Sequence, residues 1–164
     1  MERARSHMSL DLGVRALLIV VLAIVAGAAC NNSSSTAPPL PDPGPFLMAF
    51  SLDATFQGPH GGQSIAIAIV RTSDGSVVVQ ANGAVSATQD PSFTWSTGPV
   101  MQAGIDYEVH YWIDSNFGGG TLGVCDPIAI DHQWSVEFLS VANDIDWTAS
   151  HNDALTEDVC RTFD

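Results

Sequence analysis

The segment from Tyr107 to Ile113 most strongly constrains the fold, because apolar and polar side chains alternate along it. Successive side chains of a β-strand point to opposite faces of the sheet. One face would carry Tyr107, Val109, Tyr111 and Ile113, and the other would carry Glu108, His110 and Trp112. The segment therefore predicts a central strand with one face in a core.

Similar alternation recurs in other segments, which Gly, Pro, Asn and Asp residues separate. These segments are residues 46–56, 65–71, 77–80, 92–97, 134–138 and 141–149. After the N-terminal apolar run, no window has a helical period. The pattern predicts an all-β domain, a sandwich of about seven or eight short strands, with a small closed barrel as the alternative.

Residues 101–107, MQAGIDY, lead into the central strand. They resemble the Leu-x-Pro-Gly-x-x-Tyr corner of Greek-key sandwiches such as fibronectin type III and transthyretin-like domains, although Met101 replaces Leu and Ala103 replaces Pro. The resemblance implies an immunoglobulin-like or transthyretin-like Greek-key sandwich. It also implies that the Tyr107 hydroxyl bonds to the backbone a few residues upstream. The alternative is an ordinary aromatic residue in a strand.

The N-terminus has the pattern of a secretory signal peptide over residues 1–29. Basic residues precede the apolar run 16–26, and small residues lead directly into Cys30. The run is too short for a comfortable transmembrane span, which needs about 20 residues.

Small residues followed by cysteine resemble the lipobox of bacterial lipoproteins, although Gly27 stands where Leu is usual. The resemblance implies that Cys30 becomes the lipid-modified first residue, and Asn31 after it favours the outer membrane. An uncleaved signal anchor and a plain secreted protein are the alternatives.

Residues 30–45 predict a tether between the lipid and the domain. After Cys30 this segment is rich in Asn, Ser and Pro and contains almost nothing apolar. Such a composition cannot bury enough surface to order itself, and its prolines favour an extended chain. The β-sandwich domain is therefore expected to span residues 46–164.

The cysteines predict one disulfide. If Cys30 carries lipid, Cys125 and Cys160 remain as a pair in an oxidising compartment. Their bond would close a loop of about 35 residues and contribute on the order of 3–4 kcal/mol. Two free buried thiols are the alternative.

Charge restricts the partners of this chain. Its formal net charge is −13, and Arg71 and Arg161 are the only basic Lys or Arg residues after Cys30. A surface of this kind repels nucleic acid and favours cations. The expected partners are the membrane, through the lipid anchor, and an unidentified protein, peptide or glycan.

The segment that leaves the central strand has a weak resemblance to a calcium loop. Asp114, Asn116, Asp126 and Asp131 offer oxygen ligands, and Asp114 and Asn116 alternate before a glycine, as in the first half of such loops. The twelfth position of a full EF-hand loop would be Cys125 here, so that motif fails. The alternative is that Asp114 and Asn116 form side-chain turns at the strand end.

Two further sets of residues are candidates for binding. His110 and His132 would bind zinc or copper if they converge with Glu108 or Asp131, but no HxH, HxxxH or HExxH pair is present, and isolated surface histidines are the alternative. His60 and His151 complete the histidines after Cys30. If the strand face that carries Glu108, His110 and Trp112 is exposed to solvent, it is a candidate ligand-binding surface. His132 is a further candidate residue of that surface.

No motif in the chain predicts catalysis. A Gly-x-Ser-x-Gly turn and a phosphate-binding loop are both missing from the sequence. The sequence therefore favours a lipid-anchored cell-envelope β-sandwich that acts as a non-catalytic binding or structural module. A metal-binding envelope protein is the alternative, with calcium preferred over zinc or copper.

Overall fold

The computed structural model describes residues 44–164. The predicted signal peptide, the lipidated Cys30 and the tether as far as residue 43 lie outside the described residues. Within residues 44–164, no helix is long and apolar enough to cross a membrane.

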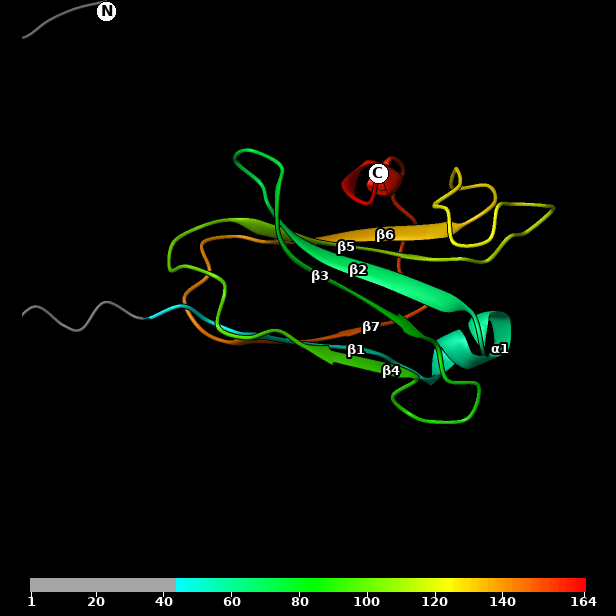
Figure 1. Cartoon of the computed structure of the whole chain (residues 1–164). Helices are drawn as coiled ribbons and strands as arrows, with labels where there is room; N and C mark the ends of the chain where they lie inside the picture. The colour runs from blue at the N-terminus through cyan, green and yellow to red at the C-terminus, as the bar shows by residue number, and fades with distance from the viewer. Residues whose placement is uncertain (1–43) are drawn as a thin grey trace, which may run out of the picture. The chain divides into compact units, whose positions relative to one another are not determined.

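Seven strands form two sheets that face each other (Figure 1). The first sheet has the order β4 (Phe93–Ser96), β1 (Met48–Leu52) and β7 (Ile145–Ala149). The second has the order β3 (Ser76–Ala84), β2 (Ser64–Arg71), β5 (Tyr107–Ile113) and β6 (His132–Phe138). Neighbouring strands are antiparallel except β1 and β7, which are parallel. The all-β prediction is confirmed at the level of a two-sheet β-structure.

The core lies between the two sheets and contains the predicted inner face of β5. Tyr107, Val109, Tyr111 and Ile113 are each at most 1% exposed. They pack with alternate residues of β2 and β1, such as Ile67 and Phe50. The rings of Tyr111 and Trp134 stack with centroids 5.1 Å apart. Burial of apolar surface on this scale is the main contribution to the stability of such a sandwich.

The structure corrects the expectation that the domain contains no helix. The predicted strand 46–56 ends at Leu52, and two short helical segments follow, η1 (Ala54–Phe56) and α1 (Gln57–His60). The Asp53 carboxylate accepts a hydrogen bond from the backbone N–H of Thr55 and so caps η1. A local cap of this kind is sufficient to start a helical turn where the alternation of apolar residues suggested continued strand.

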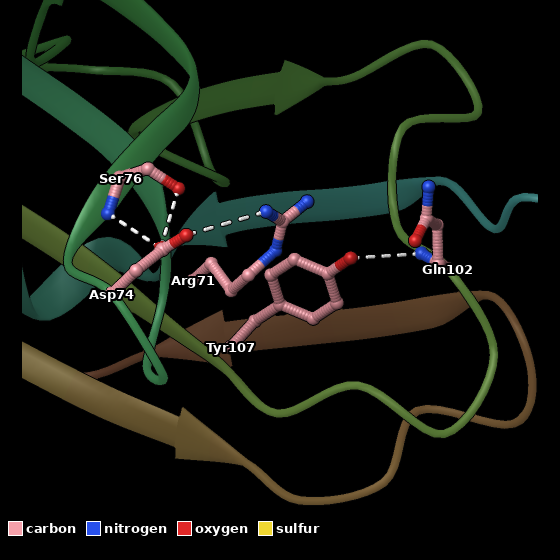
Figure 2. Close-up of polar contacts among 5 residues, drawn as sticks. All are labelled: Arg71, Asp74, Ser76, Gln102 and Tyr107. Atoms are coloured by element: carbon pink, nitrogen blue, oxygen red, sulfur yellow. Dashed lines mark hydrogen bonds and ion pairs between the residues drawn. The ribbon is translucent and has the colours of Figure 1, made fainter.

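The corner before β5 has the contact predicted from the sequence. The Tyr107 hydroxyl accepts a hydrogen bond from the backbone N–H of Gln102 at 2.9 Å (Figure 2). Gly104 has φ +73°, a left-handed conformation that glycine adopts without strain.

Figure 2 also shows Asp74 in the turn between β2 and β3. The Asp74 carboxylate accepts hydrogen bonds from Ser76 and forms an ion pair with Arg71 at 3.5 Å.

The predicted disulfide is confirmed, because the sulfurs of Cys125 and Cys160 lie at bonding distance. The bond attaches the C-terminal helical segment η2 (Val159–Thr162) to the loop that follows β5. Figure 1 shows η2, in red, outside the second sheet near β5 and β6. Phe163 contacts Trp112 edge-on at 6.3 Å, so this segment covers part of the outer face of β5.

Replacing Tyr107 with Phe should lower the free energy of unfolding by about 0.5–1.5 kcal/mol, because the hydrogen bond from the Gln102 N–H is lost. Urea denaturation measures this change. Tyr111→Phe is the matched control, since the Tyr111 hydroxyl is buried and has no hydrogen-bond partner among the described residues. That variant should be neutral or slightly stabilising, and equal losses in the two variants would contradict the assigned role of Tyr107.

Reduction of the disulfide should destabilise the domain by about 2–5 kcal/mol, because the bond restricts the unfolded chain across a sequence separation of 35 residues. Denaturation with and without reductant measures the loss. Non-reducing peptide mapping should find the peptides containing Cys125 and Cys160 joined. Immediate alkylation of both thiols in the folded, unreduced protein would disprove the pairing.

Candidate metal centre

Three histidines from distant parts of the sequence meet at one end of the sandwich. His60 is the last residue of α1, His132 is the first residue of β6, and His151 follows the end of β7. One ring nitrogen of each lies within 4.8 Å of the others. We call these residues the His cluster. Among the described residues it is the only group of three or more His, Cys, Asp and Glu side chains with this geometry.

The backbone around His60 is fixed by close packing. Phe56 of η1 is fully buried and brings α1 against the core. At Gly61 a Cβ atom would lie 2.6 Å from the Gln57 carbonyl oxygen and 2.8 Å from the Ala87 side chain, so only glycine fits. Gly62 follows with φ +89° and turns the chain into β2. His60 is thereby held at the end of a rigid turn.

His132 and His151 are positioned by the sheets. His132 pairs with Ile113 in the antiparallel ladder of β5 and β6, so its side chain shares the inner face with the core residues. His151 lies in a turn in which the backbone N–H of Ser150 donates to the Asp153 carboxylate at 2.9 Å. The backbone N–H of His151 donates to the Thr55 hydroxyl, also at 2.9 Å. That bond attaches the turn after β7 to the segment before α1.

Hydrogen bonds define which nitrogen of His60 faces the cluster. Its Nδ1 lies 2.6 Å from the side-chain Oε1 of Gln63, an acceptor, so Nδ1 carries the proton and donates. The Nε2 atom is then an electron-pair donor, and it lies 3.1 Å from Nδ1 of His132. The Nε2 atom of His151 is buried and has no hydrogen-bond partner within residues 44–164. The cluster thus brings three ring nitrogens together, and it contains one buried ring nitrogen without a partner.

Aromatic rings enclose the His cluster. Phe56 and Trp134 are buried and contact it from the core side, with centroids 5.6 Å from His151 and 5.7 Å from His132 respectively. Phe117 also contacts the cluster, with its ring centroid 5.0 Å from that of His132, and is 44% exposed. The cluster therefore lies in an apolar environment with one side near the surface.

This environment favours the neutral forms of His60 and His132. Burial lowers the pKa of His60 to about 4; the Gln63 hydrogen bond opposes the shift, and the neighbouring His132 and His151 add to it. Burial also lowers the pKa of His132, with a further contribution from His151, while Asp131 acts in the opposite direction. Neutral imidazole is the form that binds metal ions, so at neutral pH protons compete weakly for these nitrogens.

The carboxylates predicted to bind calcium are hydrogen-bonded within their own loop, whereas the buried Oδ1 atom of Asn116 has no hydrogen-bond partner among the described residues. Asp131 is fully buried, and its carboxylate accepts from the backbone N–H groups of Ser115, Asn116 and Asp126. Asp126 accepts from the backbone of Thr121 and Asp114 from that of Gly123. Asp114 and Asn116 are also hydrogen-bonded to each other. The contacts of the three carboxylates are of the kind expected for side-chain turns, and the calcium site stays a prediction.

The predicted ligand surface does not form as one face. Glu108, His110 and Trp112 lie on the outer face of β5, whereas His132 lies on the inner face of β6. His110 is hydrogen-bonded to Glu108 at 2.6 Å and to Thr162 of η2 at 2.7 Å. Trp112 is only 6% exposed beneath the C-terminal segment. The convergence of His110 with His132, considered from the sequence, is therefore not present.

Comparison with known proteins adds no family assignment. The chain matches no family model, no curated protein and no solved structure.

The His60 shift predicts that the metal-free protein loses stability as the pH falls. The unfolded histidine takes up a proton near its ordinary pKa of 6.5, whereas folded His60 resists protonation until about pH 4. Stability should therefore fall across this interval, by about 2 kcal/mol from His60 alone between about pH 7.5 and pH 5. Denaturation of chelator-treated protein at both pH values measures the difference.

In the same experiment, His60→Gln should show a pH-dependent loss that is smaller by about 2 kcal/mol. His110→Gln serves as the control, because its ring lies outside the His cluster. The explanation fails if wild type and His60→Gln respond to pH equally.

Proposed function

We propose that this protein binds a transition-metal ion, zinc or copper, through His60, His132 and His151. The observation that carries the proposal is the convergence of three ring nitrogens, one from each histidine, in a cluster where the buried Nε2 atom of His151 has no hydrogen-bond partner among the described residues. Leaving a buried polar atom unpaired costs about 1–3 kcal/mol, and a metal ion would satisfy it. Three histidines and a tetrahedral ion are a common combination in proteins.

The spacing of the ring nitrogens supports this proposal. Bonds from zinc to histidine nitrogen of about 2.0–2.1 Å imply nitrogens roughly 3.3 Å apart at tetrahedral angles. His60 Nε2 and His132 Nδ1 lie 3.1 Å apart, close to that value. All the candidate atoms lie within 4.8 Å of one another, so a small rotation of a side chain would complete the triangle.

The partner of His60 on its far side also supports a metal site. A histidine that binds a metal commonly donates its second N–H to an oxygen acceptor, which orients the ring and increases its basicity. Gln63 provides that acceptor at 2.6 Å. Imidazole ligands suit zinc and copper, whereas calcium prefers six to eight oxygens, which the His cluster lacks.

We also infer the cellular setting and the finer fold from features of the sequence. The lipobox-like residues before Cys30 favour a lipid-anchored protein of the bacterial cell envelope, where Cys125 and Cys160 would remain oxidised. The Tyr107 corner and the strand order of the second sheet favour an immunoglobulin-like Greek-key sandwich. Under this proposal the protein is a metal-binding module of the cell envelope without catalytic function.

Equilibrium dialysis followed by elemental analysis tests the function. The full-length protein should bind one zinc or copper ion, and His60→Ala, His132→Ala and His151→Ala should each weaken binding by about 100-fold or more. Gln63→Ala should weaken it by roughly 10-fold to 100-fold through the orientation of His60. Circular dichroism checks that each variant folds.

His110→Ala is the matched control for these variants. His110 belongs to the same sheet as His132 but lies on the outer face of that sheet. It should retain the affinity of the wild type. Binding that depends on His110 and is indifferent to the His cluster would show that the metal is held elsewhere.

A further inference from the structure

We propose that the metal centre keeps one coordination position for an exchangeable ligand, water or a small monovalent anion, which enters beside Phe117. This inference rests on the proposed function and adds to it a ligand class and a route of entry. It follows from the number of protein ligands, their charge and the exposure of the surrounding rings.

The His cluster supplies three ligands and no fourth. Among the described residues, no additional His, Cys, Asp or Glu atom joins the group. Gln63 and Ser115 contact His60 at Nδ1, the nitrogen opposite to the one that faces the cluster. They are therefore on the wrong side of the ring to bind the same ion. Zinc with three protein ligands commonly binds water or substrate in the fourth position.

The charge of the site favours an anion in that position. Three neutral imidazoles leave the two positive charges of the ion uncompensated. The nearest carboxylate in sequence, Asp131, has both oxygens occupied by backbone N–H groups. An unpaired charge beside Phe56 and Trp134 is costly, because these apolar rings replace water around it. A bound anion reduces this cost.

The acidic surface limits the charge of that anion. The chain has a formal net charge of −13, which repels multiply charged anions more strongly than singly charged ones. At physiological ionic strength this repulsion decays over about 8 Å. Close to the metal ion, a small monovalent anion is therefore attracted to the metal more strongly than the acidic surface repels the anion.

The exposure of the aromatic rings identifies the side of entry. Phe56 is fully buried and Trp134 is 1% exposed, so the core closes that side. Phe117 is 44% exposed, and its ring lies 6.0 Å from His60 and 5.0 Å from His132. A ligand from solvent would thus reach the centre along the edge of Phe117.

Azide binding to the copper-loaded protein tests this inference. The full-length wild type, loaded with one equivalent of Cu²⁺, should develop a new charge-transfer band that saturates with one azide per copper. At full copper loading, Phe117→Ala should increase the association rate of azide by about 10-fold, because the side of entry is wider. Leu122→Ala is the matched control, since Leu122 is 84% exposed in the same loop. It should behave as the wild type.

The outcomes separate the two proposals. Copper bound at one equivalent through the His cluster, with no change of its spectrum in saturating azide, would overturn the exchangeable position and leave the metal site intact. A rate that is equal in wild type and Phe117→Ala would overturn the route of entry. If the wild type binds no metal, the proposed function and this inference both fail.

Discussion

The burial of the inner face of β5 between two sheets is the constraint on which the rest of the structure depends. Tyr107, Tyr111 and Ile113 have no exposed surface, and each needs a partner from the opposite sheet. Phe50 of β1, for example, contacts Tyr111 edge-on at 5.1 Å. Once the two layers are held by such contacts, the loops at the ends of the sandwich have fixed starting points. The His cluster is built on those ends.

Much of this framework could be predicted from the sequence, because a strand with one buried face has a strict period of two. The same reasoning led to the corner at Tyr107, whose hydroxyl bonds as expected. The pairing of Cys125 with Cys160 followed from counting cysteines. Local turns were harder to predict, and η1 was missed because the Asp53 side-chain cap overrides an apolar pattern over a few residues.

The candidate site could not be predicted, because its residues are close only in space. His60 and His132 are 72 residues apart, and no spacing rule relates them. The pairing register of β5 and β6 determines that His132 faces inward while His110 faces outward. A shift of one residue would exchange these faces, and the single sequence does not define the register. In the sequence, nothing except its being a histidine pointed to His151 as a candidate ligand.

The parallel pairing of β1 and β7 has a consequence for how the centre assembles. Parallel strands end at the same edge of their sheet, so the chain segments carrying His60 and His151 both leave the first sheet at one end. His132 comes from the second sheet. Neither layer alone contains the three ligands. A bound ion would therefore act as a cross-link between the layers, and its capture during folding would report the moment at which the two sheets dock.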